Sequence, residues 1–242
     1  MLPSQPVACR RPLPPTAVRL TTRIASVAAL EAILVTLAAL LPIVNPLGGA
    51  PIFLAYTADL PGTARQHLAW VVTRNALLLL VVAMLGGSYV LAFFGISIPI
   101  VRVAGGLVVL ATGWKLLHAG DEPDAPPSVI SDAWEREAAK RGFYPLTFPL
   151  TVGPGSISVA ITLGAGAATG SPAGLVKTVA YLAGAGIVSA SIYICYRSAS
   201  YLSRALGETA QHVFLRLSAF ILLCVGVSIL WDGVLGLIAP LR

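Results

Sequence analysis

The chain has 242 residues, of which 57% are hydrophobic and only 11% are charged, against about 25% charged residues in a typical soluble domain. So little charge cannot cover a soluble surface, and the composition therefore excludes an ordinary soluble domain and predicts a membrane protein. The net charge of +6 does not indicate a nucleic-acid partner. The basic residues stand between apolar runs, as topology signals do, and form no basic stripe interleaved with aromatic residues.

The chain begins with a segment unlike the rest. Residues 1–25 are rich in arginine and proline and poor in long apolar runs, so we expect a disordered basic tail there. Residues 26–242 are expected to form a single transmembrane domain, because six spans of roughly 20–25 residues fit into that length.

Six apolar runs follow in chain order. They predict spans at about 32–57, 68–93, 99–118, 143–167, 173–196 and 214–238. The segment Phe94–Pro99 is expected to be a tight turn. One polar loop, 119–142, separates the third span from the fourth, and its second part has the pattern of a short surface helix.

Two short breaks interrupt the first and fourth spans. The first reads Asn-Pro-Leu-Gly-Gly-Ala-Pro from residue 45, and the second reads Gly-Pro-Gly-Ser from residue 153. Proline removes a backbone donor and glycine weakens a helix, so each break frees backbone N–H and C=O groups. Inside a bilayer these groups need partners in the protein or in a wet cavity. Paired broken helices are a sequence pointer to a transporter's binding site.

The two halves of the chain resemble each other. Residues 41–48 correspond to 148–155, and Val-Arg-Val-Ala from 101 corresponds to Leu-Arg-Leu-Ser from 215. Each half has three predicted spans, and an odd number inserts the two halves in opposite orientations. The predicted fold is an all-α membrane protein of six transmembrane helices in two inverted three-helix repeats, with helices 1 and 4 broken near the middle of the membrane.

Five motifs, in this order and spacing, resemble the MarC family of integral membrane proteins. They are LPIVNPLG at 41–48, FGISIP at 94–99, RVAGGL at 102–107, PLTFPLTVGPG at 145–155 and GVSILWDGV at 226–234. The resemblance covers about residues 30–238. It implies six helices in the bacterial inner membrane and membership of the LysE-like transporter superfamily, in which some members transport small neutral amino acids. The tail before residue 26 and the pair Arg74-Asn75 inside the second span depart from the family pattern.

The breaks supply the candidate substrate site. N-termini of the second half-helices offer N–H groups to a carboxylate, and C-termini of the first half-helices offer carbonyls to an ammonium group or Na⁺. A simpler interpretation stays open, in which Asn45 only caps its half-helix and the hydroxyls bond back to their own helix. The candidate residues are Asn45, Pro46, Gly48, Thr151, Gly153, Pro154, Gly155 and Ser156.

Arg102 and Arg216 begin their predicted spans at equivalent positions. A charge deep in a membrane is costly and marks function, but a long arginine near a helix end reaches the interface. We favour anchoring or contact with lipid headgroups over contact with substrate for both. The edge carboxylates Glu31 and Asp232 would need greater depth for a role in proton coupling.

The sequence therefore predicts a secondary transporter of a small polar or zwitterionic solute, with Na⁺ or H⁺ as coupling ion. The expected partners are the lipid bilayer and the solute, and a homo-oligomer is left open. No enzyme activity, metal or cofactor is expected, because the histidines lack partners at metal-ligand or triad spacing. The alternative is a non-transporting membrane scaffold or a stress-related membrane protein without solute flux. The loops that carry Arg65, Lys115 and Arg197 are predicted to be cytoplasmic, with the N-terminus outside.

Overall fold

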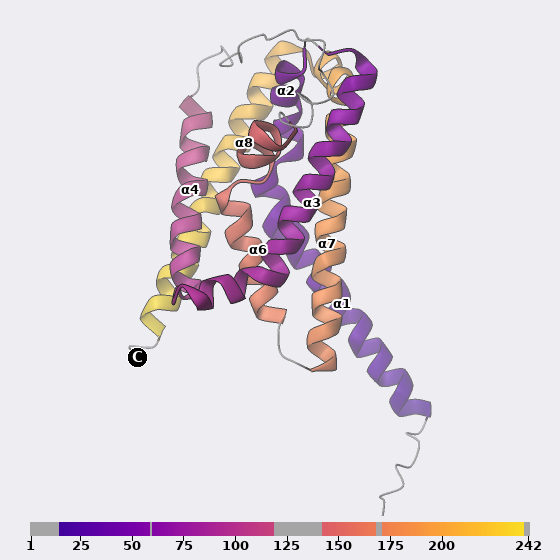
Figure 1. Ribbon diagram of the computed structural model, residues 1–242, viewed down its shortest axis with the longest axis vertical. Coiled ribbons are helices and arrows are strands. Elements are labelled where there is room, and N and C mark those ends of the chain that lie inside the picture. Colours follow the sequence, from indigo (N-terminus) through magenta and orange to yellow (C-terminus); the bar gives the residue numbers. More distant parts are fainter. Residues whose placement is uncertain (1–14, 59, 119–141, 168–170, 240–242) are drawn as a thin grey trace, which may run out of the picture.

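A computed structural model describes residues 15–58, 60–118, 142–167 and 171–239, and the regular structure within these ranges is helical. Figure 1 shows a bundle whose long helices run up and down its longest axis. Five segments are long and apolar enough to cross a membrane, and the pair η1 and α6, bent by 71°, makes a sixth if it counts as one span. The elements are α1 (Pro15–Val44), α2 (Pro46–Tyr56), α3 (Gly62–Phe93), α4 (Ile98–His118), η1 (Gly142–Thr151), α6 (Pro154–Ala167), α7 (Pro172–Arg197) and α8 (Ala199–Ile238).

Two helices begin earlier than the sequence predicts. The helix α1 begins at Pro15, inside the segment predicted to be a disordered tail. Proline is favoured in the first turn of a helix, and the alanine, leucine and arginine after it are good helix formers. The helix α8 begins at Ala199 rather than near residue 214, and a break at Gly207, with φ 68°, interrupts it. Residues 1–14 of the predicted tail and residues 119–141 of the predicted polar loop lie outside the described residues.

The predicted turn after the second span is confirmed. The amide of Gly95 donates to Ala92, and the amide of Ile96 donates to Leu91, which closes α3 as a C-terminal capping motif does. Gly95 has φ 67°, a conformation that glycine adopts without steric cost. The helix α4 then starts at Ile98, next to the predicted start at residue 99.

The packing of the helices follows the predicted inverted repeat. One half contains α1, α2, α3 and α4, and the other contains η1, α6, α7 and α8. The helix α1 packs against α7, and its counterpart η1 packs against α3. The helix α2 packs against α7, and its counterpart α6 packs against α3, while α4 packs against its own counterpart α8. Exchanging the two halves therefore reproduces these pairings. Figure 1 shows that corresponding helices run in opposite directions, with α2 and α4 rising where α6 and α8 descend.

The contact between α4 and α8 is the most extensive in the bundle, and it joins backbone to backbone. A Cβ atom on Gly106 would lie 2.6 Å from the amide nitrogen of Leu230, and one on Gly226 would lie 2.6 Å from that of Leu110. Small residues allow this approach, which membrane helices use because apolar side chains gain nothing by leaving lipid for one another.

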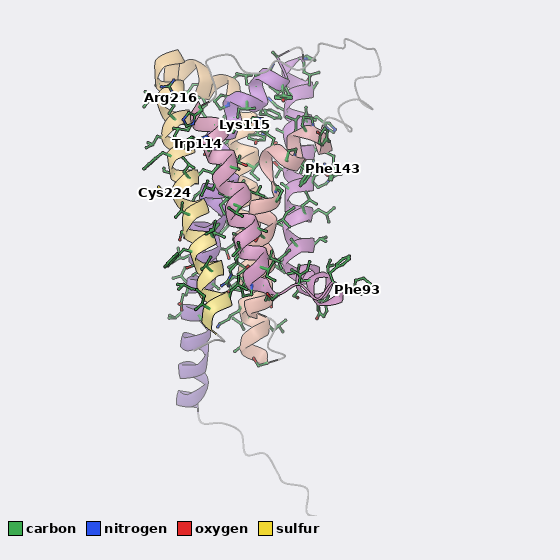
Figure 2. The ribbon with its side chains drawn as sticks, turned by 90° about the vertical axis from the view of Figure 1, so that its left-hand side faces the viewer. Phe93, Trp114, Lys115, Phe143, Arg216 and Cys224 are labelled. Carbon is green, nitrogen blue, oxygen red and sulfur yellow. The ribbon has the colours of Figure 1, made fainter. Side chains whose placement is uncertain are left out.

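Large apolar side chains cover the outside of the bundle. Phe93, Trp114 and Trp231 are each more than half exposed, and Figure 2 shows the first two on the surface of the molecule. The inside is packed by a cluster of buried residues from α1, α2, α3, η1, α6 and α7. An apolar exterior around a packed interior is the arrangement that a hydrocarbon solvent requires.

Candidate functional site

The first break is a single residue, Asn45, between α1 and α2. Asn45 has φ 44° and ψ 62°, and its side-chain Oδ1 accepts a hydrogen bond from the amide of Gly48 at 3.1 Å. Its carbonyl receives the amide of Gly49 at 2.9 Å. Asn45 is thus the N-cap of α2. Because Pro46 has no N–H, the carbonyl four residues before it loses its usual helical donor.

Gly48 allows this cap to form. A Cβ atom on Gly48 would collide with the amide group of Asn45. Gly48 and Pro46 are both buried, while Asn45 is half-buried. The structure therefore contains the capping interaction that the simpler interpretation describes, and this geometry explains why these three residues occur together.

The second break is longer, and it spans the end of η1 and the start of α6. Tyr144 and Phe148 have extended backbone angles inside η1, and the peptide bonds that join them to Pro145 and Pro149 are cis. The amide of Val152 donates to Thr147 at 2.8 Å. The helix α6 then begins at Pro154.

Two of the predicted hydroxyl groups bond back to their own segment. The Oγ1 of Thr151 donates to the carbonyl of Leu146 at 2.6 Å, and the Oγ of Ser156 donates to that of Gly153 at 2.9 Å. These bonds satisfy the two hydroxyl donors within their own segment, and the carbonyl of Gly153 also accepts the amide of Ile157 at 3.1 Å. Both side chains are buried.

The two breaks meet at the hydroxyl of Tyr196, near the end of α7. The Oη of Tyr196 lies 2.9 Å from the Oγ1 of Thr151. Because the single hydroxyl proton of Thr151 is directed to Leu146, Tyr196 is the donor in this bond. From the other break, a Cβ atom on Gly49 would lie 2.6 Å from the same Oη. One oxygen atom therefore touches both interrupted helices.

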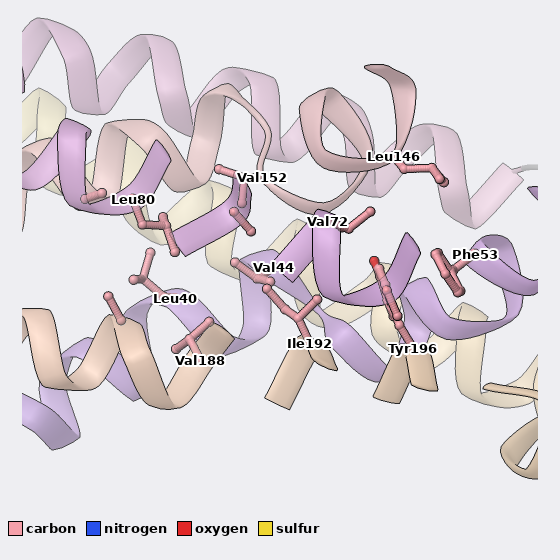
Figure 3. Packing of buried hydrophobic residues seen from close by; sticks show 14 of the residues in the cluster. Leu40, Val44, Phe53, Val72, Leu80, Leu146, Val152, Val188, Ile192 and Tyr196 are labelled. Atoms are coloured by element: carbon pink, nitrogen blue, oxygen red, sulfur yellow. The ribbon is translucent and has the colours of Figure 1, made fainter. Parts of the chain in front are cut away.

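Tyr196 is held on its ring face as well as at its hydroxyl. Its ring stacks on that of Phe53 in α2, with centroids 4.6 Å apart and planes inclined by 16°. Both rings are fully buried. Figure 3 shows them beside the cluster in which Val44 and Val152, the last residues before each break, also lie. The centre between the breaks is closely packed.

Gly155 turns toward α4 rather than toward the first break. A Cβ atom there would collide with the side chain of Val109. One turn further along α6, the Oγ of Ser158 donates to the carbonyl of Val101 in α4 at 2.8 Å. Gly155 thus permits the close packing of α6 on α4. Of its neighbours in the predicted site, Gly153 is half-buried and Pro154 is exposed.

The two predicted arginines do not join this centre. Arg102 is half-buried in the first turns of α4, and Arg216 is exposed on α8. Arg216 is the first residue of the candidate span in α8, and Figure 2 shows it on the outer surface near Lys115. The edge carboxylates Glu31 and Asp232 are exposed too. Within the described ranges, no three His, Cys, Asp or Glu side chains converge as metal ligands do.

Sequence reasoning missed three residues of this region. Tyr196 and Gly49 bring the two breaks together, and Arg65 joins three segments nearby. The sequence contained two signals for Tyr196 and Gly49. One is a tyrosine close to the basic end of an apolar span, and the other is the second glycine of the pair 48–49. Neither signal identifies a partner, because the contact joins residues 49, 151 and 196 across three helices.

The guanidinium group of Arg65 binds the carbonyl of Thr57 through Nη2 at 2.8 Å and the carbonyl of Leu60 at 3.2 Å. Its Nη1 donates to the hydroxyl of Ser200 at 2.9 Å. Thr57 caps the C-terminal end of α2, Leu60 precedes α3, and Ser200 lies in the first turn of α8. Arg65 therefore ties the ends of three elements together.

The chain is similar to proteins that are already grouped in a family. The model of a family described as MarC family integral membrane protein matches residues 30–238. An inner membrane protein MarC of Salmonella arizonae is 32% identical over 216 residues, which cover 86% of this chain and 96% of that protein. The inner membrane protein MarC of Escherichia coli O157:H7 is 31% identical over 212 residues, with the same shares covered.

No solved structure matches the chain. The relatives are named inner membrane proteins, and the apolar helices make this chain a multi-pass protein of the bacterial inner membrane. The matched segment contains both breaks and extends from the part of α1 that carries Glu31 to the end of α8. The chain belongs to the MarC family of integral membrane proteins.

Proposed function

We propose that the chain is a secondary transporter of a small polar or zwitterionic solute, such as a neutral amino acid, which binds between the two helix breaks. The observation that supports this proposal is the convergence of both breaks on Tyr196. Broken helices that face each other across an inverted repeat place helix termini and freed carbonyls at one point.

The chemistry of the breaks suits a zwitterion. The N-termini of α2 and α6 offer amide donors and the positive end of a helix dipole to a carboxylate. The carbonyls before Pro46 and Pro154 offer acceptors to an ammonium group or to Na⁺. In this proposal Asn45, Gly48, Thr151, Gly153 and Ser156 shape the binding region. The coupling ion is Na⁺ or H⁺, and no cofactor takes part.

A second candidate function is that of a membrane scaffold without solute flux. The dense packing of Val44, Val152, Phe53 and Tyr196 between the breaks favours it. In a scaffold, the breaks would serve only to let the helices approach. In a transporter, the same packing is that of a closed state, which must open for the solute to enter.

Uptake by proteoliposomes that contain the full-length chain separates these functions. We expect accumulation of radiolabelled alanine, glycine or threonine, driven by an imposed Na⁺ or proton gradient and abolished when that gradient is dissipated. Liposomes without protein give the background. The absence of gradient-driven uptake of every small zwitterion tested would leave the scaffold as the better description.

A matched pair of variants connects flux to the breaks. Thr151→Val removes the hydroxyl that joins the second break to Tyr196, while Thr112→Val removes an exposed hydroxyl that bonds to its own helix. We expect Thr151→Val to reduce uptake and Thr112→Val to leave it near wild type. Equal uptake by both variants would show that transport does not depend on the hydrogen bond between Thr151 and Tyr196.

A further inference from the structure

The two ends of the break region are closed in different ways. At one end, called here the α2 side, α2 and α7 finish at Tyr56 and Arg197. At the other, the α6 side, α6 and α3 finish at Ala167 and Phe93. The inverted repeat makes the contact of α2 with α7 the counterpart of the contact of α6 with α3.

On the α6 side the two helices touch through backbone at Gly164. A Cβ atom on Gly164 would collide with the carbonyl of Met84, so here main chain meets main chain. At the neighbouring Gly87 the contact is with the side chain of Ile161. The contact of Gly164 with Met84 joins two main chains and cannot open through a change of side-chain rotamer. This end separates only if one helix moves as a whole.

On the α2 side the equivalent contact is made by side chains. Gly49 leaves room for the hydroxyl of Tyr196, the ring stacks on Phe53, and the hydroxyl donates to Thr151. One aromatic residue of α7, with two rotatable side-chain bonds, therefore joins α2 to the second break. Its release breaks that hydrogen bond and that ring contact and takes a fully buried side chain out of the core cluster.

We infer that Tyr196 is a gate residue, and that the centre between the breaks is reached from the α2 side when Tyr196 leaves Thr151 and Phe53. The gate has its significance for solute movement only under the proposed function. Whether the gate exists, however, is tested by how readily a reagent reaches the second break, and this measurement needs no solute transport.

The test measures access to the second break with a reporter thiol. The background chain has Cys9, Cys195 and Cys224 replaced by alanine, and the reporter is Ser156→Cys, a close isostere of a buried side chain. A charged, membrane-impermeant methanethiosulfonate is added to right-side-out or inside-out vesicles. A separate Gly62→Cys chain, labelled at an exposed position at the start of α3, identifies which vesicles present the α2 side.

We expect slow labelling of the reporter in the background chain. Tyr196→Phe keeps the ring and removes only the hydrogen bond, so the labelling rate from the α2 side should rise by about two- to tenfold, the range that one hydrogen bond corresponds to. Tyr196→Ala should raise it further. The rate from the α6 side should stay unchanged in both variants.

A second pair keeps Tyr196 intact. Gly49→Ala places a methyl group where the hydroxyl lies, and should also raise labelling from the α2 side. The control, Gly186→Ala, adds the same methyl group to α7 at a position with open space around it, and should change nothing.

Unchanged labelling in Tyr196→Phe, Tyr196→Ala and Gly49→Ala would overturn the gate, as would an equal rise from both sides, which indicates general loosening. Side-specific labelling without any uptake in proteoliposomes would support Tyr196 as a gate and contradict the proposed transport function. Uptake without side-specific labelling would support the transport function and contradict the role of Tyr196 as a gate.

Discussion

Asn45 carries a backbone conformation that is unfavourable for most residues, and its side chain stabilises the start of α2. Its positive φ belongs to the left-handed region, where asparagine and glycine are the residues best tolerated. Its Oδ1 also caps α2 by accepting from Gly48. Both properties come from one short amide side chain, so this position favours asparagine for its backbone conformation and for its cap.

Substitution at Asn45 separates these two properties. Asn45→Ala loses the cap and retains the strain of a Cβ at positive φ, and we expect the free energy of unfolding to fall by about 0.5–2 kcal/mol from the cap alone. Asn45→Gly loses the cap and relieves the strain, so its loss should be smaller. Thermal unfolding of both variants in detergent measures the difference. A glycine variant less stable than the alanine variant would contradict this account.

Thr151 and Tyr196 form a buried pair whose members depend on each other. Thr151→Val leaves the tyrosine hydroxyl without its acceptor in a buried place, which costs about 1–3 kcal/mol. Thr151→Ser keeps the hydroxyl and should cost less. The double variant Thr151→Val with Tyr196→Phe removes both polar groups, so it should lose less stability than the sum of the single losses. Additive losses in this cycle would mean that the hydrogen bond contributes nothing.

The elements at the α2 side are held together by Arg65 rather than by apolar packing alone. A planar guanidinium group presents five donors in a fixed fork. Here it contacts two carbonyls, of Thr57 and Leu60, and two hydroxyls, of Thr57 and Ser200. The carbonyl of Thr57 also accepts the amide of Leu60 at 3.1 Å, so Arg65 adds a charged donor to the short turn that joins α2 to α3.

Replacement of Arg65 tests this junction. Arg65→Lys keeps the charge but cannot reach Thr57, Leu60 and Ser200 together, so we expect most of the effect of Arg65→Ala to appear in the lysine variant. A loss of about 1.5–3 kcal/mol corresponds to one hydrogen bond to a charged donor. Melting temperatures of the two variants and of the exposed control Arg74→Ala provide the comparison. A lysine variant as stable as wild type would show that the charge alone is sufficient.

In the whole molecule, the start of the first helix and the end of the last helix lie at the same end of the bundle. Figure 1 shows α1 beginning and α8 finishing toward the same end of the bundle, as six crossings require. The predicted orientation puts that end outside and the start of α3, with Arg65, in the cytoplasm.

A fusion reporter examines this orientation. Alkaline phosphatase is active only outside the cytoplasm, so we expect activity when it is joined after residue 242 and little when it is joined after Gly62. A fluorescent protein that matures in the cytoplasm should give the opposite result. A phosphatase signal after Gly62 together with fluorescence after residue 242 would reverse the orientation and leave the fold unchanged.

Much of the architecture was predictable from the sequence, because span length and the two proline–glycine breaks carry strong physical signals. The ends of α4 and α7 agree with the prediction within one residue. The start of α8 was missed, since its first turns mix charged and polar residues and lack the apolar run that marks a span. Within the candidate site, the local bonds of Asn45, Thr151 and Ser156 were predictable from residue type. The role of Tyr196 was not, because it depends on packing between distant helices.

The glycines that touch backbone have a consequence for how this sequence can change over generations. At Gly106, Gly164 and Gly226 an added methyl group meets the main chain of another helix, whereas at Gly86, Gly166 and Gly186 it meets nothing within 4 Å. Substitution of glycine is therefore tolerated in the second set and not in the first, although all six are glycines in apolar helices. In a saturation library selected for inserted, folded protein, the first set should stay glycine while the second accepts alanine and serine. The substitution record of such a library would trace the helix contacts without any further structure.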